Sequence, residues 1–567
     1  MTLQKDLNKW VIISLSATIA LVISLFIVRI IWQRLLVNIM DINVKNKKQI
    51  RYILLGFIIF LLFFCFGGWA VIHFIIPSYS PIPSNLIGIT GLVISVMCMG
   101  ALLWYIKHIK KIALTLFLLV LILNTYIFFD TEINLPKGPN VILISIDTLR
   151  ADHLGCYGYN RKTSPVIDSF AKSNILFEHC YVQDDLTLPS HMSILTSLYP
   201  ITHEVNGNNS LDLSKITLAE VLKNKGYSTL GFVRSIIWMD AKYGFNQGFD
   251  RYIVKDYNFK SPELNAEFQN AFISKYLKKY TNKNIFLFIH YYDVHSDFKQ
   301  LPYDSPFPYN NMFYPDYNGD FNGGFGDTLA SKYLIHVNHY RIKIKKDDLK
   351  YIVSLYDSGI AYIDKCIGDL FRMLKTMGLY KNSLIILTAD HGEEFQEHGL
   401  MLHGDNLFYD ETVHVPLIVK LPGQNNKPRK ISNLIESIDI MPFILDYLGI
   451  EEKPPMEGRS FADLIKDNME WKQNIFGFGS HGEAFLKNGR WKLVNDNILR
   501  KKGFRLFDIS QDPMEKKDVK NSHPEIAERL RNELFRKYKK SQRTMIQDKM
   551  VLTEKEKEKL KSLGYVK

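Results

Sequence analysis

The segment Leu384–Asp405 constrains the fold of this chain more than any other. It opens with an apolar run, Leu384–Ala389, that has the length of a buried strand, and Asp390, His391 and Gly392 follow directly. A carboxylate beside an imidazole at the carboxyl end of a strand is typical of α/β proteins, which place ligands and metal ions there. If this is a site, other strands must bring further polar groups to it.

Two more apolar runs end in residues of the same kind. VILISID ends on Asp147, and IFLFIHYYDVH ends with Asp293 and His295. Helical patterns alternate with these runs, which predicts an α/β fold with a mainly parallel sheet covered by helices. Because the carboxyl ends of parallel strands lie at one edge of a sheet, we expect these side chains to converge with Asp390 and His391.

The end of the chain has a different pattern. From Asn474 the short runs NIFGFGS, GEAFLKNGRWKLVND and FRLFDIS predict antiparallel strands, and HPEIAERLRNELFRKYKK predicts a helix after them. We therefore expect a catalytic α/β domain over residues 135–473 and a small α+β subdomain with a helical tail over residues 474–567.

Three local expectations can be checked separately. Ser190 is a plausible N-cap of a short helix, and Ile431–Ile450 has a mostly helical pattern. The irregular stretch Phe298–Thr328 has the length of a pocket rim or lid.

Four apolar segments precede the α/β region. Each has roughly the ~20 residues that cross a bilayer: Val11–Trp32, Ile53–Ile76, Ile87–Trp104 and Ile112–Phe129. The first and third connections are rich in Lys and Arg, whereas the second, PSYSPIPSN, has no charge. The positive-inside rule therefore predicts a four-helix membrane region over residues 1–134, with everything after Phe129 outside the cytoplasm.

The net charge of +12 does not indicate a nucleic-acid partner. Part of it belongs to the predicted cytoplasmic loops, and no basic run interleaved with aromatic residues and no zinc-finger spacing is present. Of the five cysteines, Cys156 and Cys180 lie in the predicted exported domain and could pair in an oxidising compartment.

Several long segments, read in order, resemble the sulfatase family of the alkaline phosphatase superfamily. The resemblance runs from about Pro139 to the carboxyl terminus, through NVILISIDTLRADHLGCYGY, TLPSHMSILTSLYP, TADHGEEFQEHG with the later HG and VPLIV, and RLFDISQDPMEKKDV. It implies a large α/β sandwich with a small carboxy-terminal antiparallel sheet, and an active site that holds a divalent metal.

The chain departs from the sulfatase pattern at the nucleophile. Sulfatases carry Cys or Ser in a C/S-x-P-S-R motif and oxidise it to formylglycine, but this chain has Thr187, which is not a substrate for that conversion. The paired aspartates of the family are here Asp147 and Thr148, and the usual Asn is His391. This set is similar to that of lipoteichoic acid synthases, phosphoethanolamine transferases and nucleotide pyrophosphatase/phosphodiesterases.

The resemblance implies a role for each site residue. Thr187 is the expected nucleophile, and Asp147, Thr187, Asp390 and His391 are the expected ligands of a divalent metal, with zinc or manganese favoured by the mixed oxygen and nitrogen donors. His295 and His403 match positions of a leaving-group acid or of ligands to a second metal, so one or two ions are expected.

Three further residues are candidates for the substrate pocket or its surroundings. Asp293 could join His295 at a second metal. Arg150 could brace Asp147 or the substrate, or form a structural salt bridge, and Asn208 resembles an oxyanion-binding Asn, although Glu204 replaces the glycine of that pattern.

Together these features predict a membrane-anchored, extracytoplasmic, metal-dependent phosphodiester hydrolase or phosphotransferase. Its expected substrate is a membrane lipid or a cell-envelope glycan. A sulfuric ester hydrolase that uses threonine directly is the alternative, and an inactive membrane scaffold is the second alternative.

Overall fold

The computed structural model describes residues 138–549, except for 236–237, 257–264, 281–282, 298–300, 322–330, 405–407, 424–427, 467–470, 480–481 and 499–501. The four apolar segments, the lysine- and glutamate-rich carboxyl end and parts of the Phe298–Thr328 stretch lie outside these residues. Within the described ranges, no helix is both long and apolar enough to cross a bilayer.

An eight-stranded sheet organises the described residues. Its strands, in spatial order, are β10 (Arg429–Glu436), β2 (Ile175–Tyr181), β9 (His414–Lys420), β6 (Ser383–Ala389), β1 (Asn140–Ile146), β5 (Ile285–Tyr291), β3 (Ser228–Ser235) and β4 (Arg251–Asp256). All neighbouring pairs are parallel except those of β9, which runs antiparallel to β2 and β6. The predicted mainly parallel sheet is confirmed.

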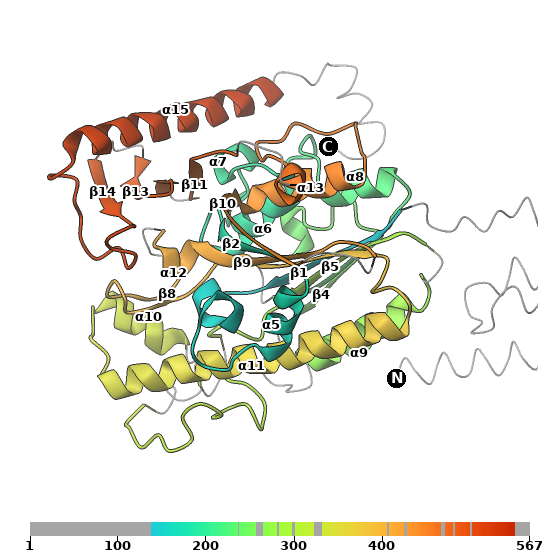
Figure 1. The fold of residues 1–567 in the computed structure, drawn as a ribbon, viewed down its shortest axis with the longest axis horizontal. Helices are drawn as coiled ribbons and strands as arrows, with labels where there is room; N and C mark the ends of the chain where they lie inside the picture. Colours follow the sequence, from blue (N-terminus) through green and yellow to red (C-terminus); the bar gives the residue numbers. More distant parts are fainter. Residues whose placement is uncertain are drawn as a thin grey trace, which may run out of the picture. The chain divides into compact units, whose positions relative to one another are not determined.

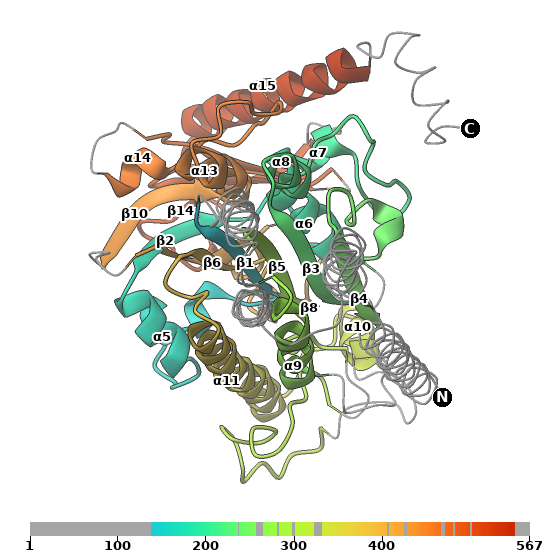
Figure 2. The same ribbon diagram turned by 90° about the vertical axis from the view of Figure 1, so that its right-hand side faces the viewer.

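Helices cover both faces of this sheet. Figure 1 shows α5, α9 and α11 on one face and α6, α8 and α13 on the other, and Figure 2 shows the same layers from the side. The α-helices are α5 (Pro165–Lys172), α6 (Thr187–Thr196), α7 (Pro200–His203), α8 (Leu218–Asn224), α9 (Ala266–Leu277), α10 (Ser331–His339), α11 (Lys346–Thr376), α12 (Asp410–Val413), α13 (Ile440–Tyr447), α14 (Ala462–Ile465) and α15 (Pro524–Lys549). Short 3₁₀ helices are η1 (Ala151–His153), η2 (Gly155–Tyr157), η3 (Ala241–Tyr243) and η4 (Ser437–Asp439).

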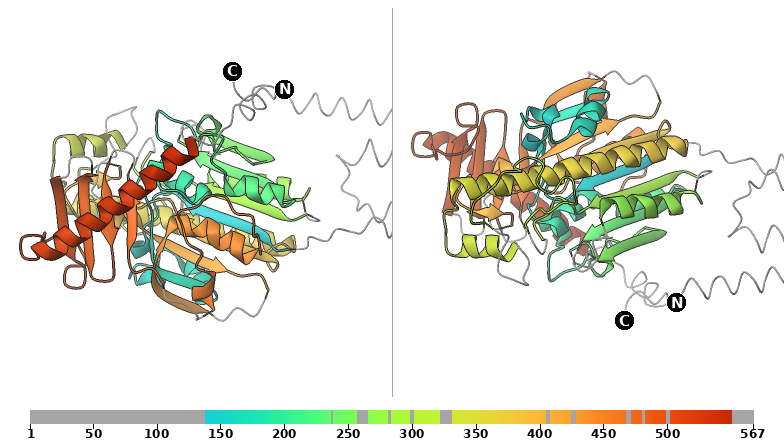
Figure 3. Two further views of the ribbon diagram at one scale, coloured as in Figure 1. Left: turned by 90° about the horizontal axis from the view of Figure 1, so that it is seen from above. Right: turned by 90° about the horizontal axis from the view of Figure 1, so that it is seen from below.

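A second, four-stranded antiparallel sheet follows at the end of the chain. It consists of β11 (Ile475–Phe478), β12 (Ala484–Lys487), β13 (Trp491–Asn497) and β14 (Lys502–Asp508). Helix α15 contacts β12 and β13, and Figure 3 shows it crossing these strands. The predicted small antiparallel carboxy-terminal sheet is therefore confirmed.

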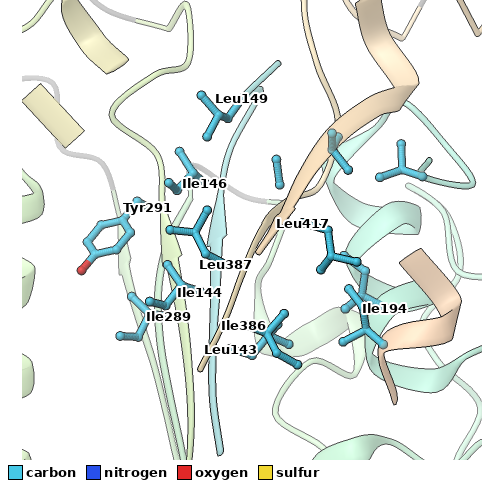
Figure 4. Packing of buried hydrophobic residues seen from close by; sticks show 14 of the residues in the cluster. Leu143, Ile144, Ile146, Leu149, Ile194, Ile289, Tyr291, Ile386, Leu387 and Leu417 are labelled. Carbon is cyan, nitrogen blue, oxygen red and sulfur yellow. The ribbon is translucent and has the colours of Figure 1, made fainter. Parts of the chain in front are cut away.

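The central strands are buried on both faces, which explains why their sequences are continuously apolar rather than alternating. Every residue of β1, β5 and β6 is buried. Leu143 and Ile386 lie toward Ile194 of α6, whereas Ile144 and Ile146 lie toward the opposite face (Figure 4). Each such side chain contributes about 1.5–3 kcal/mol when fully buried, so the strands that carry the polar site residues are anchored by their apolar residues.

The structure corrects two local predictions. The first half of Ile431–Ile450 is not helical, because β10 pairs in parallel with β2 at the edge of the sheet; only η4 and α13 in its second half are helical. Ser190 is not an N-cap, because α6 already begins at Thr187; the Ser190 hydroxyl donates instead to the backbone oxygen of Asp390 at 2.5 Å. Cys156 and Cys180 are free thiols.

Candidate active site

The candidate site lies at the carboxyl ends of β1 and β6. The register pairs Ile146, the last residue of β1, with Ala389 of β6 and with Tyr291 of β5. The next residues, Asp147 and Asp390, therefore leave the sheet side by side, and both are fully buried. This is the convergence that the apolar runs of the sequence predict.

Thr148 turns the chain sharply after Asp147. Its φ of 55° lies in the left-handed region, which a β-branched residue rarely adopts. Three hydrogen bonds hold it there: its backbone N–H donates to Asp390 Oδ1 at 3.3 Å, its hydroxyl donates to the Val294 oxygen at 3.0 Å, and Tyr356 donates to its own carbonyl at 2.6 Å. The strained turn keeps the Asp147 carboxylate at the end of the strand.

Gly392 lets the Asp390–His391 turn pass close to a neighbouring chain segment. A Cβ at this position would lie 2.0 Å from the carbonyl oxygen of Glu411, and the Gly392 N–H donates to the Thr412 oxygen at 2.7 Å. The glycine of the Asp-His-Gly sequence is therefore required by backbone packing, which in turn fixes the two preceding side chains.

Thr187 is the first residue of α6, and its hydroxyl faces His391. Thr187 Oγ1 lies 3.2 Å from His391 Nε2, and the Thr187 side chain is buried. The other ring nitrogen of His391, Nδ1, is 3.0 Å from the Gly392 carbonyl oxygen, so it carries the proton. The Nε2 lone pair consequently points at the Thr187 hydroxyl, and Asp390 Oδ2 and Asp147 Oδ1 lie 3.4 and 3.7 Å from it.

These groups fit a divalent cation. One ligand atom each from Asp147, Asp390 and His391 lies within 4.8 Å of the others. Among the described residues, neither Asp147 oxygen nor Asp390 Oδ2 receives a hydrogen bond, although all three atoms are buried. A buried carboxylate without donors is costly, and a cation among two carboxylates, an imidazole and a hydroxyl would satisfy it.

The charges of the two aspartates influence each other. Burial and the nearby Asp390 charge raise the pKa of Asp147 well above its usual value. Burial alone would raise the pKa of Asp390 as well, but His391 and His191 favour its charged form and lower that pKa to about 2. Asp390 is therefore the carboxylate that stays ionised, and Asp147 is the one that a cation would need to ionise.

Two histidines that the sequence did not assign lie beside the aspartates. His290 Nε2 is 3.4 Å from Asp147 Oδ2, while its Nδ1 is 2.6 Å from the Arg234 carbonyl oxygen. His191 Nδ1 is 3.5 Å from Asp390 Oδ2, but Ser145 and the Thr187 oxygen hydrogen-bond its two nitrogens at 2.9 Å each. Strand register is the feature that would have indicated His290, because this residue pairs with Ser145 just before the end of β1.

His295 and His403 are brought to the same place. The rings of His391 and His403 are 4.2 Å apart between centroids, and those of His403 and His295 are 5.3 Å apart. The buried Glu393, which the sequence also left unassigned, lies 3.2 Å from His403 Nδ1. Burial lowers the pKa of His295 to about 3, and the Asp297 N–H donates to its Nδ1, so the neutral ring carries its proton on Nε2.

Three candidate residues have other partners in the structure. Asp293 accepts from Arg234 at 2.6 Å and from the Ala266 N–H at 3.1 Å, and a role for it with His295 at a second metal stays a prediction. Arg150 forms ion pairs with Asp152 and Glu397, both at 2.7 Å, which is the structural alternative considered for it. Asn208 is exposed and lies in a turn closed by the bridge between Asn206 and Asn209, whereas the residues of the cluster are buried.

Comparison with known protein families shows to which family the chain belongs. The family model described as Sulfatase matches residues 139–450, more than half of the sequence. The chain belongs to the sulfatase family. A second model, described as the N-sulphoglucosamine sulphohydrolase C-terminal region, matches residues 396–542, which include the antiparallel sheet and most of α15.

Characterised members of this family and its superfamily are distant relatives. An ulvan-active sulfatase of Formosa agariphila is 26% identical over 59% of this chain, which spans 66% of that protein's length. The multifunctional alkaline phosphatase superfamily protein PehA of Trinickia caryophylli is 25% identical over 59% of this chain and 79% of its own. The crystal structure of a phosphonate monoester hydrolase of Agrobacterium radiobacter matches with a TM-score of 0.57 at 20% identity, covering 72% of this chain and 96% of that one, and shows the shared fold.

The family and the geometry agree on the kind of chemistry. Enzymes of the sulfatase superfamily are metal-dependent, and the buried cluster of this chain is a possible metal site. The structure brings together Asp147, Thr187, Asp390, His391, His295 and His403, and the role of each stays a prediction.

Proposed function

We propose that the chain is a metal-dependent hydrolase of sulfate esters in which Thr187 is the nucleophile. The observation that carries this proposal is the position of the Thr187 hydroxyl, 3.2 Å from His391 Nε2 and beside two buried carboxylates, three of whose four oxygens receive no hydrogen bond among the described residues. The relatives support sulfate as the transferred group, because sulfatases predominate among them. They therefore reverse the order predicted from the sequence, in which phosphoryl transfer came first.

Each residue of the site has a separate role in the proposed reaction. A bound cation, for which zinc and manganese suit the donor set, supplies positive charge that favours the ionised hydroxyl of Thr187. Thr187 attacks the ester in line, and its place at the start of α6 puts the developing negative charge at the positive end of the helix. The neutral His295 can donate a hydrogen bond from Nε2 to the leaving-group oxygen, and His403, next to Glu393, can exchange a proton with the leaving group or with water.

A phosphate ester is the second candidate, and Thr187 itself favours it. Formylglycine gives sulfatases a hydrate that expels the sulfate, whereas threonine must be freed by a second attack on the central atom. A phosphothreonine is resolved in this way by water, or by an acceptor alcohol in a phosphotransferase. PehA and the phosphonate monoester hydrolases are the relatives that fit this alternative.

Parallel assays separate the two candidates. The purified full-length chain, loaded with zinc or with manganese, is given 4-nitrophenyl sulfate and bis(4-nitrophenyl) phosphate at equal concentrations. Faster release from the sulfate ester, lost in Thr187→Ala, supports the first candidate. Faster release from the phosphate ester supports the second, and no release from either contradicts both.

We further propose that the four apolar segments anchor the enzyme in the cytoplasmic membrane with the catalytic part outside. Their lengths and the charges of their loops support this topology. A lipid headgroup or a cell-envelope glycan is then the nearest substrate. Reporter fusions after Phe129 test the topology: a periplasmic or extracellular reporter should be active there, and activity of a cytoplasmic reporter at the same position contradicts the proposal.

A further inference from the structure

Helix α10 and the turn after it present a surface that the catalytic chemistry does not use. It combines exposed cations, exposed apolar side chains and imidazoles within twelve residues. We call it the α10 surface, and its members are Lys332, Ile335, His336, His339, Tyr340, Arg341, Ile342 and Lys343. Soluble surfaces normally scatter such apolar residues singly, so their concentration beside cations indicates a ligand.

The apolar part of this surface is built around Tyr340. The Tyr340 ring is 61% exposed, and its centroid lies 4.4 Å from that of His336 and 4.5 Å from that of His339. Ile335 and Ile342 are 55% and 39% exposed. The result is a platform of rings and aliphatic groups that can pack against the face of a flat or ring-shaped ligand.

The cations of the surface are available for an anionic ligand. Lys332, Arg341 and Lys343 are exposed, and no carboxylate among the described residues pairs with any of them. Lys345, by contrast, forms an ion pair with Asp320 at 2.5 Å. Three positive charges without a carboxylate partner in the described part of the chain, next to an apolar platform, favour a ligand that carries several negative charges.

The α10 surface is attached to the loop that carries site residues. The Asn338 side chain makes two hydrogen bonds of 2.7 Å with the backbone of Met401 in β8 (Met401–Leu402), which pairs with β7 (Glu394–Phe395). Gln396 hydrogen-bonds the backbone of Ile342 and Ile344 at 2.8 and 3.0 Å. His403 follows β8 directly, and Figure 1 shows α10 beside β8, so α10 lies next to the hairpin that leads to the site.

We propose that the α10 surface binds an anionic glycan whose sulfate- or phosphate-bearing chain runs along this hairpin into the active site. The inference rests on the proposed function for the identity of the scissile group. The site residues are buried, and a linear ligand can place one ester among them and keep further charged units on α10. A bilayer surface, which is flat, cannot do both. Sugar rings pack on Tyr340, and their anionic groups pair with Lys332, Arg341 and Lys343.

Binding to a labelled sulfated glycan tests the proposal without requiring catalysis. The full-length chain and the triple variant Lys332→Glu, Arg341→Glu, Lys343→Glu are titrated against a fluorescent heparin oligosaccharide. The control, Lys172→Glu, Lys275→Glu, Lys279→Glu, makes the same change of charge on exposed positions of α5, of α9 and of the turn after α9. We expect about tenfold weaker binding in the first variant. The slope of log Kd against the logarithm of the salt concentration should also be smaller, by about two to three.

Kinetics then distinguish this proposal from the proposed function. In the α10 variant, KM should rise for a polymeric anionic ester and stay within about twofold of the parent value for a 4-nitrophenyl ester; Tyr340→Ala should show the same split more weakly. Equal glycan binding by the α10 variant and the control overturns the proposal, even if the small ester is hydrolysed. Loss of binding only to anionic lipid micelles, with glycan binding intact, also overturns it. Absence of small-ester hydrolysis in the parent contradicts the proposed function instead.

Discussion

Two clusters of charged residues in this molecule, the first buried and the second centred on the partly exposed Asp410, differ in their hydrogen bonds. In the active-site cluster, Asp147 has no hydrogen-bond donor among the described residues. In the second cluster, near β13 of the carboxy-terminal sheet, Asp410 accepts from Lys492 at 2.6 Å, from Lys487 at 3.0 Å and from Tyr181 at 3.0 Å. Lys492, fully buried, also pairs with Glu515 at 2.8 Å.

The difference separates a structural cluster from a functional one. Buried charges that are fully paired hold segments together, because removing one partner leaves the other uncompensated. Buried charges that lack partners lower stability, and a fold keeps them only where something else binds. Asp410 therefore joins the two sheets, and we propose that Asp147 serves catalysis. Each variant of the next three predictions changes one cluster and should leave the property of the other unchanged.

The largest expected effect is on the rate of the Thr187→Ala variant. Loss of the nucleophile should lower kcat by about 10⁴-fold, because residues of a catalytic unit act together, while the melting temperature stays close to that of the parent. Thr196→Ala, in the last turn of the same helix, is the matched control and should keep kcat. An active Thr187→Ala enzyme contradicts the assignment of the nucleophile.

The second cluster should respond in stability rather than in rate. Lys492→Met leaves Asp410 and Glu515 with fewer partners and should lower the free energy of unfolding by about 3–5 kcal/mol. Thermal unfolding measures the loss, and kcat per folded molecule should not change. A Lys492→Met protein as stable as the parent would show that this cluster contributes little to the junction of the sheets.

Addition of metal should stabilise the molecule through the first cluster alone. A free zinc or manganese concentration 100-fold above Kd should add about 2.7 kcal/mol to the unfolding free energy of the parent. Asp147→Asn should lose this gain, and Lys492→Met should keep it. A chelator that leaves the melting temperature of the parent unchanged is the contrary result.

His203, a buried neutral group outside both clusters, has the smallest expected effect when stability is compared over one pH unit. His203 is fully enclosed, and burial lowers its pKa to about 3, below the usual value near 6.5. Between these two pH values the unfolded chain binds one more proton, so stability falls as pH drops from 6.5 toward 3, by about 1.4 kcal/mol per pH unit. His203→Gln should reduce this slope by about that amount in pH-dependent unfolding, and an unchanged slope would contradict the burial effect.

Much of the fold followed from local patterns in the sequence. The runs that became β1, β5 and β6 are apolar throughout because both faces of each strand are buried, and their polar ends converge because parallel strands share an edge. The same reasoning failed for β10, whose exposed edge position gives it a mixed pattern that is compatible with a helix.

The site was harder to predict where partners come from distant segments. Asp293 resembles Asp147 in the sequence, yet Arg234 of β3 neutralises it, and the sequence gives no sign of that pairing. The sequence did not indicate Glu393 and His290 as site residues, because only the packed fold shows that they lie beside His403 and Asp147. Strand ends can be predicted from periodicity, but the pairing of charges depends on packing.

Metal content tests the central claim most directly. The full-length chain, purified with zinc or manganese and freed of loosely bound ions, is analysed by elemental mass spectrometry together with Asp147→Ala, Asp390→Ala and Lys492→Met. We expect about one tightly bound metal equivalent in the parent and in Lys492→Met, and none in the two aspartate variants. Equal metal content in the parent and in the folded Asp147→Ala protein would contradict it.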